Sequence, residues 1–134
     1  MCSSDLTSTL GGHMNDPTYE CLTQAGPLSE VRFVHDYVQL VLWTNTLSIY
    51  PRLHVSTGER ILSSDDSGFY DGICGLIGQS LVAATRVEKV RLEFLFSGGT
   101  KLLVSLRPQD AVGPEIAALS DATGAYLMVE RHDD

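Results

Sequence analysis

Residues 90–106 read VRLEFLFSGGTKLLVSL and carry the clearest structural pattern of the chain. Apolar side chains recur at every second position on both sides of the glycines, which predicts two half-buried β-strands. The face that the two strands share carries Val90, Leu92, Phe94, Phe96, Leu102, Val104 and Leu106. Gly98 and Gly99 supply the positive φ angles of a tight turn. We therefore expect a β-hairpin with this face in the core and Lys101 on the opposite face.

Further strands are expected on both sides of this hairpin. Residues 31–33 alternate in polarity, and residues 37–43 are rich in β-branched and aromatic side chains. A turn at Asn45 leads into a return strand that ends near Pro51, because proline lacks the N–H that a central strand donates. Shorter strands are expected at residues 54–55, 60–62 and 125–129, with turns at residues 57–58 and 121–124.

One helix is expected after the polar break at residues 63–67. Four apolar side chains fall on one helical face, at the spacing i, i+4, i+7 and i+8: Phe69, Ile73, Leu76 and Ile77. Asp66 or Ser67 can cap the free N–H groups at its start. Gly78 suits the left-handed residue that commonly follows a helix.

These elements predict an α+β fold, a mostly antiparallel sheet built from hairpins with one helix packed across a face. A chain of 134 residues fits one domain. One more helical turn is expected within residues 113–119, where Pro114 stands before an apolar run. The expected divisions are a disordered leader at residues 1–13, an N-terminal extension at 14–29, a single α+β domain at 30–130 and a frayed tail at 131–134.

The leader has the composition of a segment foreign to the fold. Residues 1–13 are rich in Ser, Thr and Gly and show no periodicity. Residues 2–6 resemble the translation of a sequencing adapter, and Gly12-His13-Met14 resembles a cloning-site junction. We therefore expect residues 1–13 to be non-native and Met14 to be the start.

The charge balance favours some partners and disfavours others. The chain has 17 acidic and 9 basic residues, a formal net charge of −8, and its basic residues are scattered along the sequence. Nucleic acid is a polyanion that usually needs a clustered basic face, so nucleic-acid binding is not expected. An acidic surface suits a basic protein partner, and it also keeps a protein soluble.

Cysteine usage and hydropathy indicate the compartment. The three cysteines, Cys2, Cys21 and Cys74, form no disulfide framework, which points to a reducing cytoplasm. No apolar run approaches the ~20 residues of a membrane helix, so no membrane association is expected. Cys74, in the middle of the expected helix, has the setting of a small core residue rather than of a nucleophile.

Five residues are candidates for a functional site. His35 and Asp36 are adjacent, and their side chains can meet in a turn but not in a strand, so acid–base chemistry and a plain hairpin corner both remain open. Tyr37, Trp43 and Tyr50 are aromatics that anchor an interface if they lie on an outer sheet face, although a core position is favoured for Trp43. No metal site, cofactor or catalytic motif is expected, because no ligand spacing or phosphate loop occurs.

Several stretches resemble a group of small standalone bacterial proteins of unknown function. The resemblance lies in residues 31–40, 47–51, 76–78, 92–108 and 113–115 and covers the chain from about Glu30 to Val129. In size, acidity and strand content the chain is also similar to small immunity proteins, which neutralise toxins. The expected function is thus non-catalytic protein binding, of the kind an immunity protein performs against a toxin. The alternative is a small-molecule-binding or enzymatic domain that uses His35 and Asp36 in a cleft.

Overall fold

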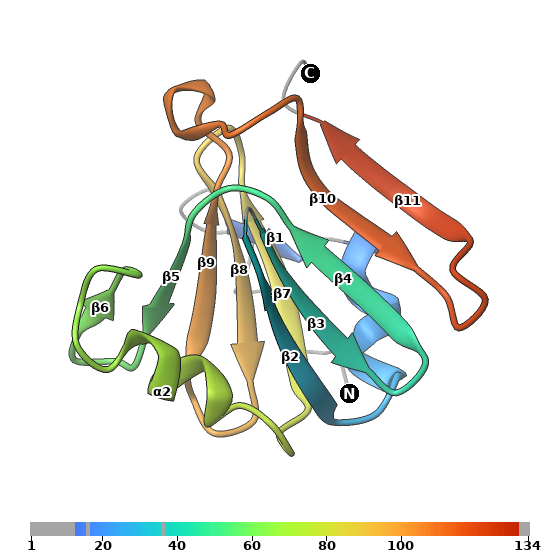
Figure 1. Cartoon of the computed structure of the whole chain (residues 1–134), viewed down its shortest axis with the longest axis horizontal. Helices are drawn as coiled ribbons and strands as arrows, with labels where there is room; N and C mark the ends of the chain where they lie inside the picture. Colours follow the sequence, from blue (N-terminus) through green and yellow to red (C-terminus); the bar gives the residue numbers. More distant parts are fainter. Residues whose placement is uncertain (1–12, 16, 36, 132–134) are drawn as a thin grey trace.

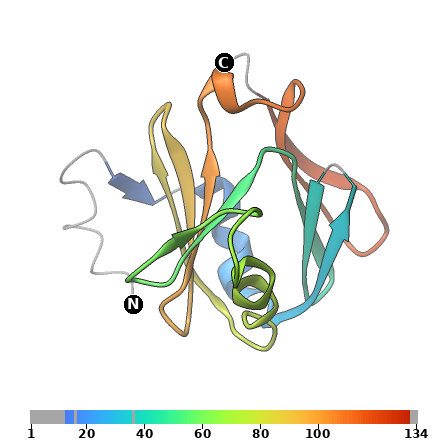
Figure 2. The ribbon, with the colours of Figure 1, turned by 60° about the vertical axis from the view of Figure 1, so that its left-hand side comes forward.

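The computed structural model describes residues 13–15, 17–35 and 37–131. They form two antiparallel sheets that face each other (Figures 1 and 2). Sheet A has the strand order β1 (His13–Asn15), β7 (Leu81–Val87), β8 (Arg91–Phe96), β9 (Lys101–Ser105), β5 (Leu53–Ser56) and β6 (Ile61–Leu62). Sheet B has the order β11 (Tyr126–Arg131), β10 (Glu115–Ser120), β4 (Asn45–Ile49), β3 (Tyr37–Leu42) and β2 (Leu28–Val34). The helices are η3 (Pro17–Gln24), α2 (Phe69–Cys74) and η4 (Pro108–Asp110).

The core lies between the two sheets because each strand buries alternate side chains. From sheet A it receives Leu53, Val55, Ala84, Leu92, Phe94, Phe96, Leu102 and Val104, and from sheet B Leu40, Leu42, Leu47, Ile49, Ala117 and Leu119. The hairpin predicted at residues 90–106 is therefore confirmed, with β8 and β9 paired in antiparallel register. Gly99 takes the expected positive φ in its turn, at 97°, whereas Gly98 does not.

The N-terminal helix η3 lies between the two layers (Figure 2). Its Tyr19 and Leu22 are fully buried, and the Tyr19 ring meets the ring of Phe94 edge-on at 5.2 Å between centroids. The Tyr19 hydroxyl donates a hydrogen bond to Glu130 of β11. The segment 14–29, expected as an extension, thus contributes fully buried side chains, and this helix was not predicted.

The helix α2 is shorter than predicted and begins differently. Its N-cap is Gly68, with φ 92° and no side-chain cap, so the prediction of Asp66 or Ser67 as the cap is wrong. The Asp66 carboxylate instead accepts hydrogen bonds from the N–H and hydroxyl of Ser63, which hold the preceding turn. Phe69 and Ile73 are buried as expected, whereas Cys74 is exposed, so its predicted core position is wrong.

A glycine lets α2 approach sheet A closely. A Cβ added to Gly72 would lie 3.2 Å from Val55 Cγ1, so α2 packs beside β5 (Figure 1). Because sheet B covers the inner face of sheet A, α2 occupies one end of the structure instead of crossing a whole sheet face. The mostly antiparallel fold is confirmed, and the helical content is small.

The C-terminal part differs from the prediction at one element. Residues 115–120 form β10, not a helical turn, because Ile116, Ala117, Ala118 and Leu119 are all buried in sheet B between β4 and β11. The last strand is confirmed as β11, which includes Arg131 from the expected tail. Residues 132–134 and 1–12 lie outside the described residues, and His13, expected in the leader, pairs with Val87. No helix among the described residues is long and apolar enough to cross a membrane.

Candidate functional site

An open cleft of about 360 Å³ lies where the β2–β3 hairpin of sheet B approaches α2. Most of its lining is aromatic or aliphatic: Phe33, Val34, Tyr37, Val38, Tyr50, Pro51, Leu53, Phe69, Tyr70 and Val112, with His35, Arg52 and Ser64. We call it the aromatic cleft. A concave, largely apolar surface with a few polar groups is the usual form of a binding site.

Two pairs of contacting rings line the aromatic cleft. Phe33 of β2 meets Tyr70 of α2 edge-on, with 5.0 Å between ring centroids. Tyr37 at the start of β3 and Tyr50 just after β4 lie 5.3 Å apart in a tilted arrangement. Such pairs contribute about 0.5–1.5 kcal/mol beyond the area they bury, so the walls are mutually supported before any ligand binds.

Much of this aromatic surface remains accessible to solvent. Phe33 is 43% exposed, Tyr70 52% and Val112 62%. Large apolar side chains that remain exposed side by side are uncommon on a surface without a partner, whereas scattered single ones need no explanation. The aromatic cleft is therefore the best candidate for a contact site.

The Tyr50 phenol is neutral at physiological pH. Its burial, followed by the nearby Glu115 and Tyr126, raises the pKa of Tyr50 above its ordinary value. A neutral phenol keeps the wall apolar and retains a hydroxyl that can donate a hydrogen bond.

The predicted site residues are only partly brought together. His35, Tyr37 and Tyr50 all line the aromatic cleft, with His35 exposed in the turn between β2 and β3. Asp36 lies outside the described residues, so the expected His35–Asp36 contact stays a prediction.

Trp43 lies at the other end of the β3–β4 hairpin, away from the aromatic cleft. It is 67% exposed, so the core position favoured for it is wrong. The strand buries Leu40 and Leu42, so alternation does not direct the following residue into the core, and Trp43 and Thr44 form the turn.

The sequence pattern missed Phe33, Tyr70 and Val112 as cleft residues. Phe33 was expected in a strand, but its exposure depends on where β2 ends relative to α2. Tyr70 carried a usable signal, since it follows the buried Phe69 and falls off the apolar face of the helix.

Acidic residues adjoin the lining residues Ser64 and Tyr70 on the α2 side of the cleft. Asp65, Asp66 and Asp71 are all exposed there, and Glu59 is exposed in the neighbouring β5–β6 turn. Arg52 in the lining forms an exposed ion pair with Asp65, at 3.4 Å, which offsets part of its charge. The aromatic cleft thus has an apolar centre and a partly acidic rim.

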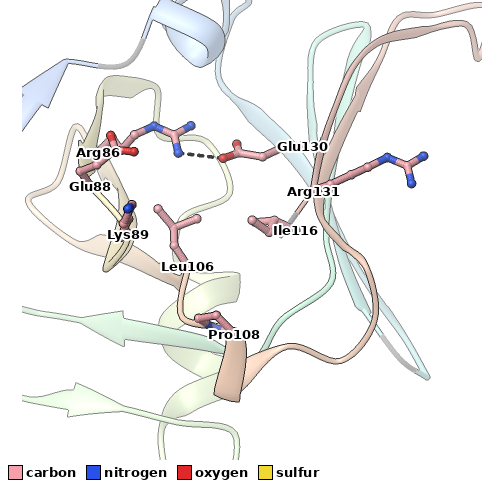
Figure 3. Close-up of a pocket in the computed structure, with 8 residues that line it drawn as sticks. All are labelled: Arg86, Glu88, Lys89, Leu106, Pro108, Ile116, Glu130 and Arg131. Atoms are coloured by element: carbon pink, nitrogen blue, oxygen red, sulfur yellow. Dashed lines mark hydrogen bonds and ion pairs between the residues drawn. The ribbon is translucent and has the colours of Figure 1, made fainter. Parts of the chain in front are cut away.

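A second cleft, of about 210 Å³, lies between the two sheets (Figure 3). Arg86 of β7 crosses it to Glu130 of β11 at 2.8 Å, and Leu106 and Ile116 form an apolar floor. The Arg131 guanidinium points away from this cleft (Figure 3). Since Glu130 receives hydrogen bonds from both Arg86 and Tyr19, its carboxylate is committed to joining the sheets, and we assign no ligand here.

The remaining chemistry of the described chain is sparse. No group of three or more His, Cys, Asp or Glu side chains within residues 13–15, 17–35 and 37–131 could hold a metal ion. A scan against known protein families, a search of curated proteins and a search of solved structures each find no match to this chain.

Proposed function

We propose that this protein is a non-catalytic protein-binding domain whose contact site is the aromatic cleft. The observation that carries the proposal is the group of exposed aromatic side chains at the junction of the two sheets, headed by Phe33 and Tyr70. Aromatic residues dominate the energetic centres of protein interfaces, where a polar rim excludes water around them. The cleft would receive an apolar side chain of the partner.

The acidic rim indicates a basic partner. With a net charge of −8 and exposed carboxylates at Asp65, Asp66 and Asp71, the surface attracts a basic protein over a distance of about one Debye length. Inhibition of a basic toxin, in the manner of the small immunity proteins, is one function that this charge and this surface would serve. The likeness to the group of small bacterial proteins of unknown function is part of the same proposal.

The alternative is a small-molecule or enzymatic site at His35. Its support is that His35 lines the aromatic cleft. A general base must lie within hydrogen-bond reach of the proton that it removes and is usually oriented by a second group. Protein binding is preferred because the lining of the cleft is mostly aromatic or aliphatic and its Phe33 and Tyr70 side chains remain exposed.

The test is the affinity of a purified complex. A partner captured from cells that express the protein is purified, and its binding to Tyr70→Ala is compared with its binding to Tyr126→Ala. Both tyrosines are more than half exposed, but only Tyr70 lines the cleft. Tyr70→Ala should weaken binding by at least about fivefold, the change expected for an interface residue worth 1 kcal/mol or more, whereas Tyr126→Ala should change it by less than about twofold.

The salt dependence of binding and the effect of His35→Ala distinguish the protein-binding proposal from the enzymatic alternative. Raising the salt concentration from about 0.05 to about 0.5 M shortens the Debye length from roughly 14 to roughly 4 Å, so association with a basic partner should slow markedly. His35→Ala should weaken that binding less than Tyr70→Ala does, because protein binding requires no proton transfer by the imidazole. Binding that is insensitive to both salt and Tyr70→Ala would contradict the proposal, and turnover of a small molecule that is lost with His35→Ala would establish the alternative.

A further inference from the structure

The outer face of sheet B has a regular arrangement of side chains. Strand register aligns one row of outward residues, Val129, Ala118, Ser48, Gln39 and Arg32, and a second row, Tyr126, Ser120, Thr46, Val41 and Glu30. Tyr50, Tyr37 and Val34 continue the face toward the aromatic cleft. In Figure 2 sheet B forms the right-hand layer, and no helix or strand of the described chain lies outside it.

The centre of this outer face is made of small side chains. Ala118 is 3% exposed and Ser48 is 7% exposed, although no second layer covers them. Gln39 donates a hydrogen bond to the Ser48 hydroxyl at 3.1 Å, which pairs the polar groups within the face. Two larger side chains of the outward rows, Tyr126 and Val129, remain exposed beside this low centre.

Within the described part of the chain, the outer face carries no excess charge, in contrast to the full sequence. Its charged residues form two ion pairs at opposite edges, Arg32 with Glu30 at 3.1 Å and Arg131 with Glu115 at 3.8 Å. The chain as a whole has a net charge of −8. Two copies of the chain therefore repel least when they approach each other through this face.

The Trp43 turn supports a role for this face in association. Trp43 has a φ of 59°, a conformation that a bulky residue adopts only with strain, and its ring lies against Gly26. A Cβ on Gly26 would be 3.3 Å from Trp43 Cβ, so glycine permits this close approach. Despite this contact the indole is 67% exposed, so a large apolar side chain remains open to solvent at the end of sheet B.

We propose that the outer face of sheet B pairs with the same face of a second copy of the chain to form a weak, reversible dimer. Five strands about 4.8 Å apart and three side-chain rows about 7 Å apart give each copy a flat area of roughly 400–500 Å². A pair of copies therefore buries about 800–1,000 Å², at the lower end for a biological interface, so dissociation occurs readily. This dimer leaves the Phe33–Tyr70 side of the aromatic cleft open and does not depend on the function proposed above.

Sedimentation velocity on the full chain tests the dimer from about 1 µM to about 1 mM, the range in which an interface of this size dissociates. The wild type should pass from monomer to dimer as its concentration rises. Added salt should favour the dimer, because it screens the repulsion between two acidic copies. The single tryptophan supplies a second measurement, since the emission of Trp43 should shift to shorter wavelength as the dimer forms.

Two valine variants form a matched pair. Val129→Asp introduces a charge on the outer face of sheet B, and Val82→Asp introduces the same charge on β7 of sheet A, where the valine is 53% exposed. Val129→Asp should weaken the dimer by at least about tenfold and Val82→Asp by less than about twofold. Tyr126→Glu serves the same purpose if Val129→Asp does not fold.

Three outcomes would overturn the proposal. A wild-type chain that stays monomeric at about 1 mM has no such interface. A dimer that is weakened by Val82→Asp and not by Val129→Asp uses another surface. A tryptophan emission that is unchanged across the monomer–dimer transition places Trp43 outside the contact.

Discussion

At the scale of single residues, neighbours along one strand have opposite roles. Phe94 lies in the core, while Glu93 beside it is almost completely buried on the outer side of sheet A. Burial opposes ionisation of the Glu93 carboxyl, but the hydrogen bond from Arg91 at 2.6 Å and the charge of Lys101 at 3.3 Å outweigh it, and its pKa lies below the ordinary value. A buried carboxylate is thus tolerated because it has two cationic partners.

Phe94→Ala and Lys101→Ala test this assignment of faces. Phe94→Ala should lower the free energy of unfolding by about 3–5 kcal/mol, because it removes a buried ring and leaves a cavity. Lys101→Ala should lower it by less than about 1 kcal/mol, since Lys101 is half-exposed and Arg91 remains beside Glu93. Urea denaturation measures both changes, and equal losses would show that the faces are wrongly assigned.

At the scale of elements, two turns of sheet A both contain a residue with a positive φ angle, but the residue types differ. The β8–β9 turn places Gly99 at φ 97°, whereas the β7–β8 turn places Lys89 at φ 64°. Glycine adopts a positive φ without a steric cost, and a side chain there costs about 1 kcal/mol. The β7–β8 turn therefore contains a strain that glycine would relieve.

Exchanging these residue types should have opposite effects. Lys89→Gly should leave stability unchanged or raise it by up to about 1 kcal/mol, because relief of strain competes with the greater freedom of glycine in the unfolded chain. Gly99→Lys should lower stability by about 1–2 kcal/mol. Thermal unfolding of both variants measures the pair, and a large loss with Lys89→Gly would mean that the lysine side chain itself is needed.

At the scale of the whole molecule, contacts far apart in sequence join the two sheets. Tyr19 packs on Phe94 of sheet A, and its hydroxyl donates a hydrogen bond to the Glu130 carboxylate of sheet B. The Glu130 carboxylate also accepts a hydrogen bond from the guanidinium of Arg86 of sheet A, at 2.8 Å. The N-terminal helix η3 therefore contributes side chains to the core and connects the two sheets.

Two truncations test this role of η3. Deleting residues 1–12 removes none of the described contacts, so the unfolding temperature should stay within about 2 °C, less than the shift expected for 1 kcal/mol. Deleting residues 1–25 removes the fully buried Tyr19 and Leu22 and should prevent stable folding. Circular dichroism during heating distinguishes the two, and a folded shorter chain would contradict the role assigned to η3.

Local pattern was sufficient for the β8–β9 hairpin and for several other strands, but it did not predict β7 or β10. Alternation over residues 90–106 predicts the β8–β9 hairpin with the correct inner face, and Gly78 and Gly99 both have the positive φ expected of them. These features depend on side-chain period and on the steric freedom of glycine, which act over a few residues.

Tertiary contacts determined the second sheet and the environment of the aromatic residues. Residues 113–119 have a proline and an apolar run that suit a short helix, yet they form β10 because β4 and β11 supply hydrogen-bond partners on both sides. Trp43 was expected in the core from its residue type, but it follows the buried Leu42 at the β3–β4 turn and is 67% exposed. The aromatic cleft joins Phe33 to Tyr70, 37 positions apart in the chain, through the packing of α2 against the end of sheet B. Such contacts depend on how separate elements meet, and a local pattern in one element contains no information about the other.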